Sequence, residues 1–336
     1  MHCSHPIPGV LQTSVVAIAL AFTAPHLAAA GWWGGKAEGA APSIPLRVTY
    51  SNKVDYEPLM VAVDQGFFRD EGLEVKPLLV TGGIESAEAL ATGAADVAAM
   101  GDAPAVISVS KYPRNKIVCA YGGGSQRHRL MASTGIRTPQ DLEGKRLGIQ
   151  LGSSTHGCFL AWAKANGLEV SRVEVLSLRP AEIPLAMDTG QLDAMAGSEP
   201  WATHTETLCG PRVHELATFK GHMGTSPMVL VASRRTLETK PEAVAMLIRA
   251  LRRAVDWVNA NHPRTAAICA PLTGLSLRDQ ERCTYTLTWE LRWTPDDAQS
   301  LALTAQFLLD HGKIATLPDL AGAVDTQFIA PPRQPR

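Results

Sequence analysis

The chain has 336 residues, of which 46% are hydrophobic and 19% are charged, and its formal net charge at pH 7 is −1. This length is sufficient for two lobes or domains, and the composition excludes a chain that is disordered throughout. Basic and acidic residues are interspersed, without the clustered basic stretch that a nucleic-acid-binding surface requires.

The first thirty residues differ from the rest because they contain no Lys, Arg, Asp or Glu. Val10–Ala24 is apolar but too short and interrupted to span a membrane comfortably, and Leu27–Ala30 supplies the small residues that precede signal-peptidase cleavage. We therefore interpret residues 1–30 as a signal peptide cleaved near Ala30, which predicts a periplasmic location. Residues 31–45, rich in Gly, Ala and Pro, are predicted to form a flexible leader.

After this leader, short apolar runs alternate with longer amphipathic ones. The short runs, bounded by Gly, Pro or polar residues, predict strands, and the longer runs predict helices. Such alternation is typical of an α/β protein with a largely parallel sheet. The predicted strands cover residues 46–50, 74–80, 96–100, 116–121 and 130–133, and the predicted helices cover residues 58–65, 84–91 and 103–111.

The stretch from Leu79 to Ser108 indicates where a ligand binds. It has the pattern strand, glycine turn, helix, strand, glycine turn, helix, with Gly82-Gly83 and Gly101-Asp102 at the ends of its strands. In open α/β sheets ligands bind at the carboxyl ends of strands, and a helix N-terminus favours negative charge. Gly82 and Gly83 also allow backbone N–H groups to approach a ligand closely. The stretch therefore predicts a small polar ligand held by the main chain.

A second unit of the same kind follows in the chain. Its predicted strands cover residues 146–150, 173–178 and 194–197, and its predicted helices end near Asn166 and Thr189.

Two similar short strands, residues 130–133 and 228–233, bracket this second unit, which suggests a pair of hinge crossings. We therefore predict that residues 46–133 and 228–328 form a first lobe and that residues 134–227 form a second.

The remainder of the chain has a helical pattern. Helices predicted over residues 242–259, 263–270, 277–286 and 294–310 are expected to cover the first lobe, and residues 329–336 are expected to be a disordered tail.

Five cysteines remain after the predicted cleavage, without a CxxC pair or zinc-ligand spacing, and we expect them to be buried thiols. A disulfide between Cys269 and Cys283 is an alternative, because they lie on successive predicted helices in an oxidising compartment.

Candidate ligand contacts in the first lobe lie at the ends of predicted strands. Ser51, Asn52 and Tyr56 offer a hydroxyl, an amide and an aromatic ring, although Ser51 and Asn52 are also ordinary helix-capping residues. Asp102 is predicted either to meet an amine or ring N–H of the ligand or to cap the helix that follows it.

In the second lobe, Ser153, Ser154 and Thr155 are the strongest polar candidates, because hydroxyls and free N–H groups at a helix start bind oxyanions. Capping of that helix is compatible with the same role. Trp201 offers an apolar wall, whereas the neighbouring Glu199 would repel a bare anion at neutral pH. The acid favours a zwitterion, or a heterocycle with N–H donors, over a simple inorganic anion.

We predict no metal and no cofactor. The region that invites a metal hypothesis contains His204, Glu206, His214 and His222, but His204 and Glu206 are two positions apart and would not face one another on a helix.

Six motifs occur along the chain in a characteristic order: Tyr56-Glu57-Pro58, Ala62–Leu73, Gly101–Pro104, Asp141–Gly148 with Gly152-Ser153-Ser154, Gly190–Ala194, and Glu199-Pro200-Trp201. Together they resemble the periplasmic solute-binding proteins of ABC importers for nitrate, sulfonate and taurine. That group includes the NMT1/THI5-like pyrimidine-binding proteins. The resemblance covers residues 46–325 and is more specific for the family than for the ligand.

This resemblance implies a type II periplasmic-binding fold, in which two α/β lobes joined by a two-crossing hinge close on one small molecule. It also implies a monomeric binding protein rather than an enzyme, with an ABC permease as its partner at the inner membrane. We expect the ligand to be a small sulfonate, a related oxoanion or a zwitterion.

Three alternatives remain open at this stage. The first is a binding protein for a pyrimidine or another thiamine-precursor heterocycle, and the second is a sensor-linked ligand-binding module. The third is an enzyme, either one like the thiamine-pyrimidine synthase or a secreted hydrolase. The enzyme hypothesis is disfavoured because the cysteine-rich motif of the synthase and the GxSxG elbow of a hydrolase do not occur in the sequence.

Overall fold

A computed structural model describes residues 43–329 of the chain. The predicted signal peptide, the leader up to residue 42 and the tail from residue 330 lie outside the described residues. The last two positions assigned to the leader belong instead to the first strand, because β1 begins at Ile44.

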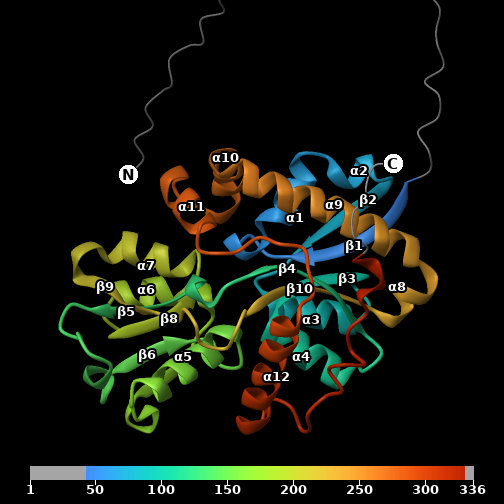
Figure 1. The fold of residues 1–336 in the computed structure, drawn as a ribbon. Coiled ribbons are helices and arrows are strands. Elements are labelled where there is room, and N and C mark those ends of the chain that lie inside the picture. The colour runs from blue at the N-terminus through green and yellow to red at the C-terminus, as the bar shows by residue number, and fades with distance from the viewer. Residues whose placement is uncertain (1–42, 330–336) are drawn as a thin grey trace, which may run out of the picture. The chain divides into compact units, whose positions relative to one another are not determined.

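The described chain folds around two five-stranded sheets (Figure 1). In each sheet the first three strands are parallel and the fourth is antiparallel to them. The fifth strand, at the far edge, is antiparallel to the fourth. In the first sheet the order is β2 (Leu73–Leu79), β1 (Ile44–Tyr50), β3 (Val97–Gly101), β10 (Pro227–Ala232) and β4 (Lys116–Gly123). In the second it is β7 (Glu174–Ser177), β6 (Arg146–Ile149), β8 (Ala194–Ser198), β5 (His128–Ser133) and β9 (Val213–Thr218).

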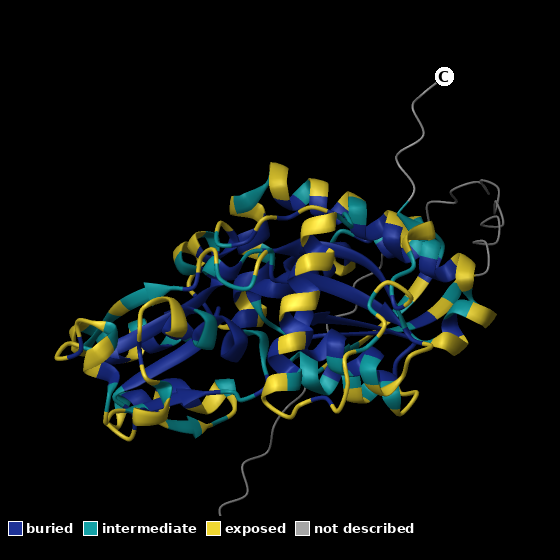
Figure 2. Ribbon diagram, turned by 60° about the horizontal axis from the view of Figure 1, so that its bottom comes forward, coloured by how far each residue is buried: buried dark blue, intermediate teal, exposed yellow. Residues whose placement is uncertain are grey.

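Helices cover both faces of each sheet, as buried parallel strands require. One face of the first sheet packs against α1 and α9 and the other against α4 and α12, while the second sheet lies between α5 on one face and α6 with α7 on the other. The outer faces of these helices are exposed (Figure 2). The helices are α1 (Glu57–Asp64), α2 (Phe67–Asp70), α3 (Gly83–Ala91), α4 (Asp102–Lys111), α5 (Ser154–Ala165), α6 (Ile183–Asp188), α7 (Trp201–Cys209), α8 (Arg234–Thr239), α9 (Pro241–Ala260), α10 (His262–Thr273), α11 (Leu277–Thr284) and α12 (Pro295–Asp310).

The predicted place of one strand is wrong. Residues 130–133 were expected in the first lobe, but they belong to β5, which pairs with β8 and β9 in the second sheet. The chain therefore crosses between the sheets at residues 124–127 and returns at residues 219–226. The sequences of β5 and β10 are similar for a reason other than a pair of hinge crossings. Each is the buried antiparallel strand of its own sheet, and this shared environment favours the same apolar residues.

Four elements were not predicted: α2, α7, α8 and β9. The strand β9 is an edge strand of intermediate and exposed residues and lacks a clear apolar alternation, and α7 follows Pro200 without a conventional capping residue. Cys269 and Cys283 are both buried free thiols, so the alternative of a disulfide between them is wrong for this structure. Among the described residues, no helix combines the length and the apolar character needed to cross a membrane.

Candidate ligand-binding site

A cavity, here called the central cavity, lies between the carboxyl ends of the parallel strands of the two sheets. It contains about 840 Å³ of space that no protein atom fills, part of it continuous with solvent. Of the residues predicted to contact a ligand, those lining the cavity are Tyr56, Gly82, Gly83, Ser153, Ser154, Thr155 and Trp201.

Three helices begin at this cavity: α3 at Gly83, α5 at Ser154 and α7 at Trp201. The first N–H groups of a helix have no intrahelical acceptor, and the helix dipole adds partial positive charge there. At α5, the Ser153 hydroxyl accepts from the His156 N–H at 3.3 Å and donates to the Gln150 carbonyl at 2.7 Å. Ser153 is therefore the N-cap of a helix whose first turn faces the cavity, so both roles predicted for it are geometrically compatible.

The end of β3 in the first sheet contacts the start of this helix. A Cβ added to Gly101, at the end of β3, would lie only 2.8 Å from Oγ of Ser154. The backbone N–H of Ala103 lies 3.5 Å from the same hydroxyl. Glycine at position 101 is therefore required for this contact rather than for a special backbone angle, since its φ of −76° is available to any residue.

The structure places the other four predicted residues outside the cavity lining. Ser51 donates to the Thr81 carbonyl at 3.1 Å, and Asn52 is only partly buried. Asp102 is buried, and its carboxylate accepts from the Ala103 N–H at 2.9 Å and from the Thr304 hydroxyl at 2.8 Å. Asp102 is therefore the first residue of α4 and not its N-cap, which is Gly101, so the capping alternative is wrong; its carboxylate instead ties α4 to α12.

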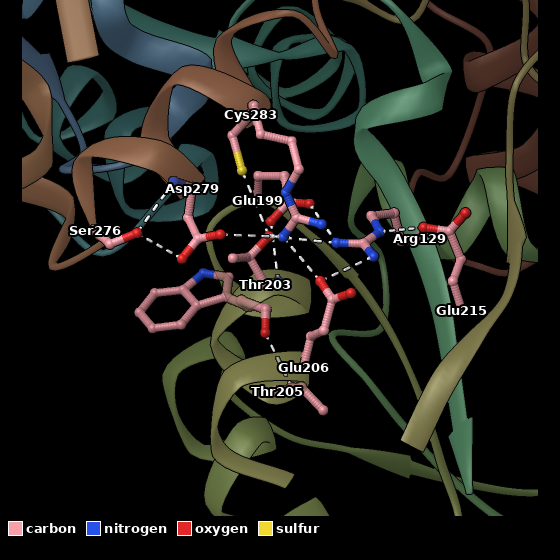
Figure 3. A network of polar contacts seen from close by, with 11 residues as sticks. Arg129, Glu199, Thr203, Thr205, Glu206, Glu215, Ser276, Asp279 and Cys283 are labelled. Carbon is pink, nitrogen blue, oxygen red and sulfur yellow. Dashed lines mark hydrogen bonds and ion pairs between the residues drawn. The ribbon is translucent and has the colours of Figure 1, made fainter. Parts of the chain in front are cut away.

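Glu199, the fourth of these residues, lies in a polar network that satisfies its charge (Figure 3). The side chain is 1% exposed, accepts from Nη1 of Arg129 at 2.9 Å and accepts from the Thr203 N–H at 3.1 Å. Arg129 also pairs with Glu206 and Glu215. The inference that Glu199 repels a bound anion is therefore wrong, because the buried guanidinium neutralises the carboxylate before any ligand enters.

Several charged residues of the cavity were missed by sequence reasoning. Arg127 is 1% exposed, its Nε lies 3.0 Å from Oδ1 of Asp55, and Lys53 lies 3.4 Å from the other oxygen of that acid. Nη1 of Arg127 also donates at 2.8 Å to the carbonyls of Gly124 and Ser226, one on each crossing between the sheets. The available signal was the pair of basic residues that directly follows the glycine-rich loop after β4.

His128, the next residue, also lines the cavity. Its side chain is 2% exposed, and Nδ1 lies 2.8 Å from the Thr155 hydroxyl. Within residues 43–329, Nε2 is buried without a hydrogen-bond partner. Burial, together with the positive charges of Arg127 and Lys53, holds the pKa of His128 well below its usual range. The imidazole is therefore neutral, and when Thr155 donates to Nδ1 the proton is on Nε2, available to a ligand acceptor.

Two aromatic residues complete the cavity. Trp201 lines it from the start of α7, and its Nε1 donor is buried without a partner in the described part of the chain. Tyr56 lines it from the first sheet, and burial raises the pKa of its phenol far above the physiological range. The cavity thus combines flat apolar surfaces with neutral N–H and O–H donors, which is the chemistry of a binding site.

The residues considered for a metal do not form a ligand cluster. Glu206 pairs with Arg129 and Arg282, and His204 contacts the Thr273 carbonyl. Across the described residues, no group of three His, Cys, Asp or Glu side chains is close enough to hold a metal ion.

The two sheets, the two crossings and the cavity between them are the architecture of a periplasmic binding protein with the type II fold. The solved structure of the alkanesulfonate-binding protein SsuA from Xanthomonas axonopodis pv. citri, bound to MOPS, has a TM-score of 0.76 and 24% sequence identity, and covers 85% of this chain and 100% of that chain. The sequence model of the NMT1/THI5-like family matches residues 53–266. The chain belongs to this NMT1/THI5-like family.

Curated relatives agree with a role in binding a small molecule. The taurine-binding periplasmic protein of Escherichia coli is 25% identical over 300 residues, which cover 84% of this chain and 93% of that protein. A protein of Brucella abortus named as a binding protein is 28% identical over 237 residues, which cover 68% of this chain and 72% of that protein.

Proposed function

We propose that this chain is the extracytoplasmic substrate-binding component of an ABC importer. In this proposal its two lobes close over a small sulfonate, a related oxoanion or a zwitterion. The observation that carries the proposal is the central cavity, which is lined both by the first residues of α5 and by the neutral His128, whose buried Nε2 has no hydrogen-bond partner within residues 43–329.

Affinity for an oxyanion comes from neutral donors in this site. Arg127 is already paired with Asp55 and with two carbonyls, so its charge is largely satisfied before a ligand binds. Buried N–H groups that point at an anion form strong charge-assisted hydrogen bonds because the acceptor is ionised. A ligand acceptor that reaches buried donors without a protein partner removes the cost of leaving them unsatisfied, and this favours binding.

The two lobes can close over a ligand because the cavity lies between two separate sheets. Ligand contacts come from both sides: Tyr56 and Gly83 belong to the first sheet and its helices, while Thr155 and Trp201 belong to the second. A ligand that contacts both sides stabilises the closed arrangement over an open one by its difference in affinity for the two. The closed form is then the form presented to the permease.

The relatives named as periplasmic proteins, together with the apolar N-terminal stretch, support export, cleavage near Ala30 and a periplasmic location. We propose a monomer whose partner is the permease at the inner membrane. No observation favours nucleic acid as a partner, and the chemistry of the cavity is that of binding rather than turnover.

A pyrimidine-like heterocycle is the second candidate ligand. Trp201 and Tyr56 are the observation that favours it, because flat rings stack on aromatic walls while buried donors meet ring nitrogens and carbonyls.

The experiment is a ligand screen of the purified protein by thermal unfolding, followed by isothermal titration calorimetry of every hit. Short alkanesulfonates, taurine, nitrate, sulfate and substituted pyrimidines form the panel. We expect at least one sulfonate or related oxoanion to raise the unfolding temperature, with a shift that grows with the logarithm of its concentration relative to Kd. Stabilisation by pyrimidines alone would select the second candidate. Absence of any binding, with turnover of one of these compounds, would contradict a binding protein.

A further inference from the structure

We propose that the central cavity has two chemically opposite ends. The oxyanion of the ligand binds at the second-sheet end, formed by the start of α5 with His128 and Trp201, and a cationic ammonium group faces Glu85 at the first-sheet end. This inference rests on the proposed function and narrows it to zwitterions that have an oxyanion and an ammonium group a few bonds apart.

The second-sheet end presents donors. Helix α5 has twelve residues and begins at the cavity, so its first-turn N–H groups and its dipole favour negative charge. The second, independent observation is His128, whose imidazole is 2% exposed and whose Nε2 lacks a partner in the described chain. The buried Nε1 of Trp201 adds another donor without a partner there. Among residues 43–329, no acidic side chain from this side lines the cavity.

The first-sheet end differs because its helix start carries an acid. Glu85 lines the cavity from the first turn of α3. Its Oε2 lies 3.5 Å from the point that a Cβ on Gly82 would occupy, so the carboxylate folds back over the start of its own helix. A carboxylate in this position offsets the positive end of the helix dipole. The glycine turn at residues 82–83 is therefore a poor anion site, which revises the role predicted for it.

The other charged residues of the first-sheet end pair with one another, two cations with one acid. Asp55 pairs with both Lys53 and Arg127. In contrast, no ion pair joins Glu85 to any Lys or Arg within residues 43–329. Glu85 is thus the lining acid whose charge is left for a ligand. At the opposite end, Arg179 lines the cavity with a side chain that is 80% exposed and lies 3.7 Å from Glu182. The polarity of the cavity therefore runs from donors at α5 to an acceptor at α3.

The test compares two ligands of nearly the same shape by isothermal titration calorimetry. Taurine and propane-1-sulfonate differ in one position, where an ammonium group replaces a methyl group. We expect wild-type protein to bind taurine at least about tenfold more tightly, which corresponds to about 1.4 kcal/mol. Glu85→Gln should bring this ratio close to one, chiefly by weakening taurine. Glu88→Gln is the matched control, because Glu88 lies on the same helix but is exposed outside the cavity lining.

A second variant tests the contribution of the oxyanion end independently of the ammonium end. His128→Ala should weaken both ligands by a similar factor and leave their ratio unchanged, because the sulfonate is common to both. A wild-type ratio near one, or a ratio that Glu85→Gln does not alter while both ligands still bind, would overturn the two-ended cavity and leave the proposed function intact. If neither these ligands nor any other oxoanion binds, the proposed function fails as well.

Discussion

Glu57 shows how burial determines the protonation of a single residue. Its side chain is 0% exposed, and its Oε1 accepts from the Gln280 amide at 2.5 Å and from the Thr284 hydroxyl at 2.7 Å. Burial raises the pKa of this carboxyl from an ordinary value of 4.5 to about 8, and the two hydrogen bonds offset only part of that effect. The folded protein therefore retains a proton at neutral pH that the unfolded chain has lost.

This difference predicts a pH dependence with a definite sign. Between about pH 4.5 and pH 8 the folded state binds the extra proton, so the contribution of Glu57 to the free energy of unfolding is full at low pH and is lost as pH rises through this window. Glu57→Gln should remove that slope, which is at most about 1.4 kcal/mol per pH unit. Urea unfolding of both proteins at pH 5, 6, 7 and 8 measures it. Exposed Glu74→Gln is the control, and parallel pH profiles for wild type and Glu57→Gln would contradict the assignment.

Substitution of Arg129 is expected to lower the stability of the fold more than ligand binding. Its removal leaves Glu199 buried without its cation, and breaking a buried pair in this way typically costs about 3–5 kcal/mol. We expect Arg129→Met to lower the free energy of unfolding by that order and Arg129→Met/Glu199→Gln to recover a substantial part. Chemical denaturation measures both. If Arg129→Met were as stable as wild type, the ion pair with Arg129 would not be needed to keep Glu199 buried.

At the scale of elements, the contact between the end of β3 and the start of α5 controls how closely the sheets approach. Gly101→Ala introduces a Cβ that would lie only 2.8 Å from Oγ of Ser154. Either β3 or α5 must therefore shift. We expect this variant to retain its fold and to bind ligand at least about tenfold more weakly. Adding Ser154→Ala removes the clashing oxygen and should restore much of the affinity. Calorimetric Kd values for the four proteins of this double-mutant cycle provide the measurement.

Additivity of the two substitutions would contradict this view, because a steric contact predicts a strong positive coupling between them. Equal thermal stability of the single variants and wild type is the accompanying control for intact folding.

The same elements show what could be predicted from sequence. Strands such as β3 and helices such as α9 follow from apolar periodicity, which is a local property. The sheet to which β5 belongs was not predictable, because two buried antiparallel strands look alike when their partners are unknown. Membership is set by pairing with β8, more than sixty residues further along the chain.

Site residues could be predicted when their role depends on neighbouring residues in the sequence, and not when it depends on tertiary contacts. The glycine turn at residues 82–83 and the serine-rich start of α5 were recognised, since turn and capping signals lie within a few residues. Glu199 was misjudged because its neutralising partner Arg129 lies on another element. His128 was missed for the same reason: its position against Thr155 and its free Nε2 depend on tertiary packing.

At the scale of the whole molecule, the two crossings connect the cavity to the hinge. The N–H of Gly124 donates to the Thr225 carbonyl at 2.8 Å, and Arg127 bridges the crossings while it pairs with Asp55 at the cavity. The return crossing contains Met223 and Ser226 with positive φ angles of 60° and 42°, which non-glycine residues adopt only when the surroundings hold them. Ser300 of α12 holds them here, donating to the Met223 carbonyl at 2.6 Å and accepting from the Ser226 N–H at 3.0 Å.

Helix α12 also joins the two halves of the molecule, in addition to the two crossings. Helix α12 packs on α4 of the first sheet and also contacts α5 beside the second. The side chain of Phe307 on α12 meets the ring of His156 on α5 with their centroids 5.4 Å apart. In the proposed function, a ligand at the start of α5 contacts a helix that is joined through α12 to the first sheet.

The central claim is that a small oxyanion binds between the two sheets at the start of α5. A crystal structure of the protein with bound taurine or a short alkanesulfonate tests it most directly. We predict the sulfonate oxygens within about 3.2 Å of Nε2 of His128 and of backbone N–H groups in the first turn of α5. A sulfonate bound instead at the start of α3 or against Lys53, or a ligand found outside the central cavity, would contradict the account.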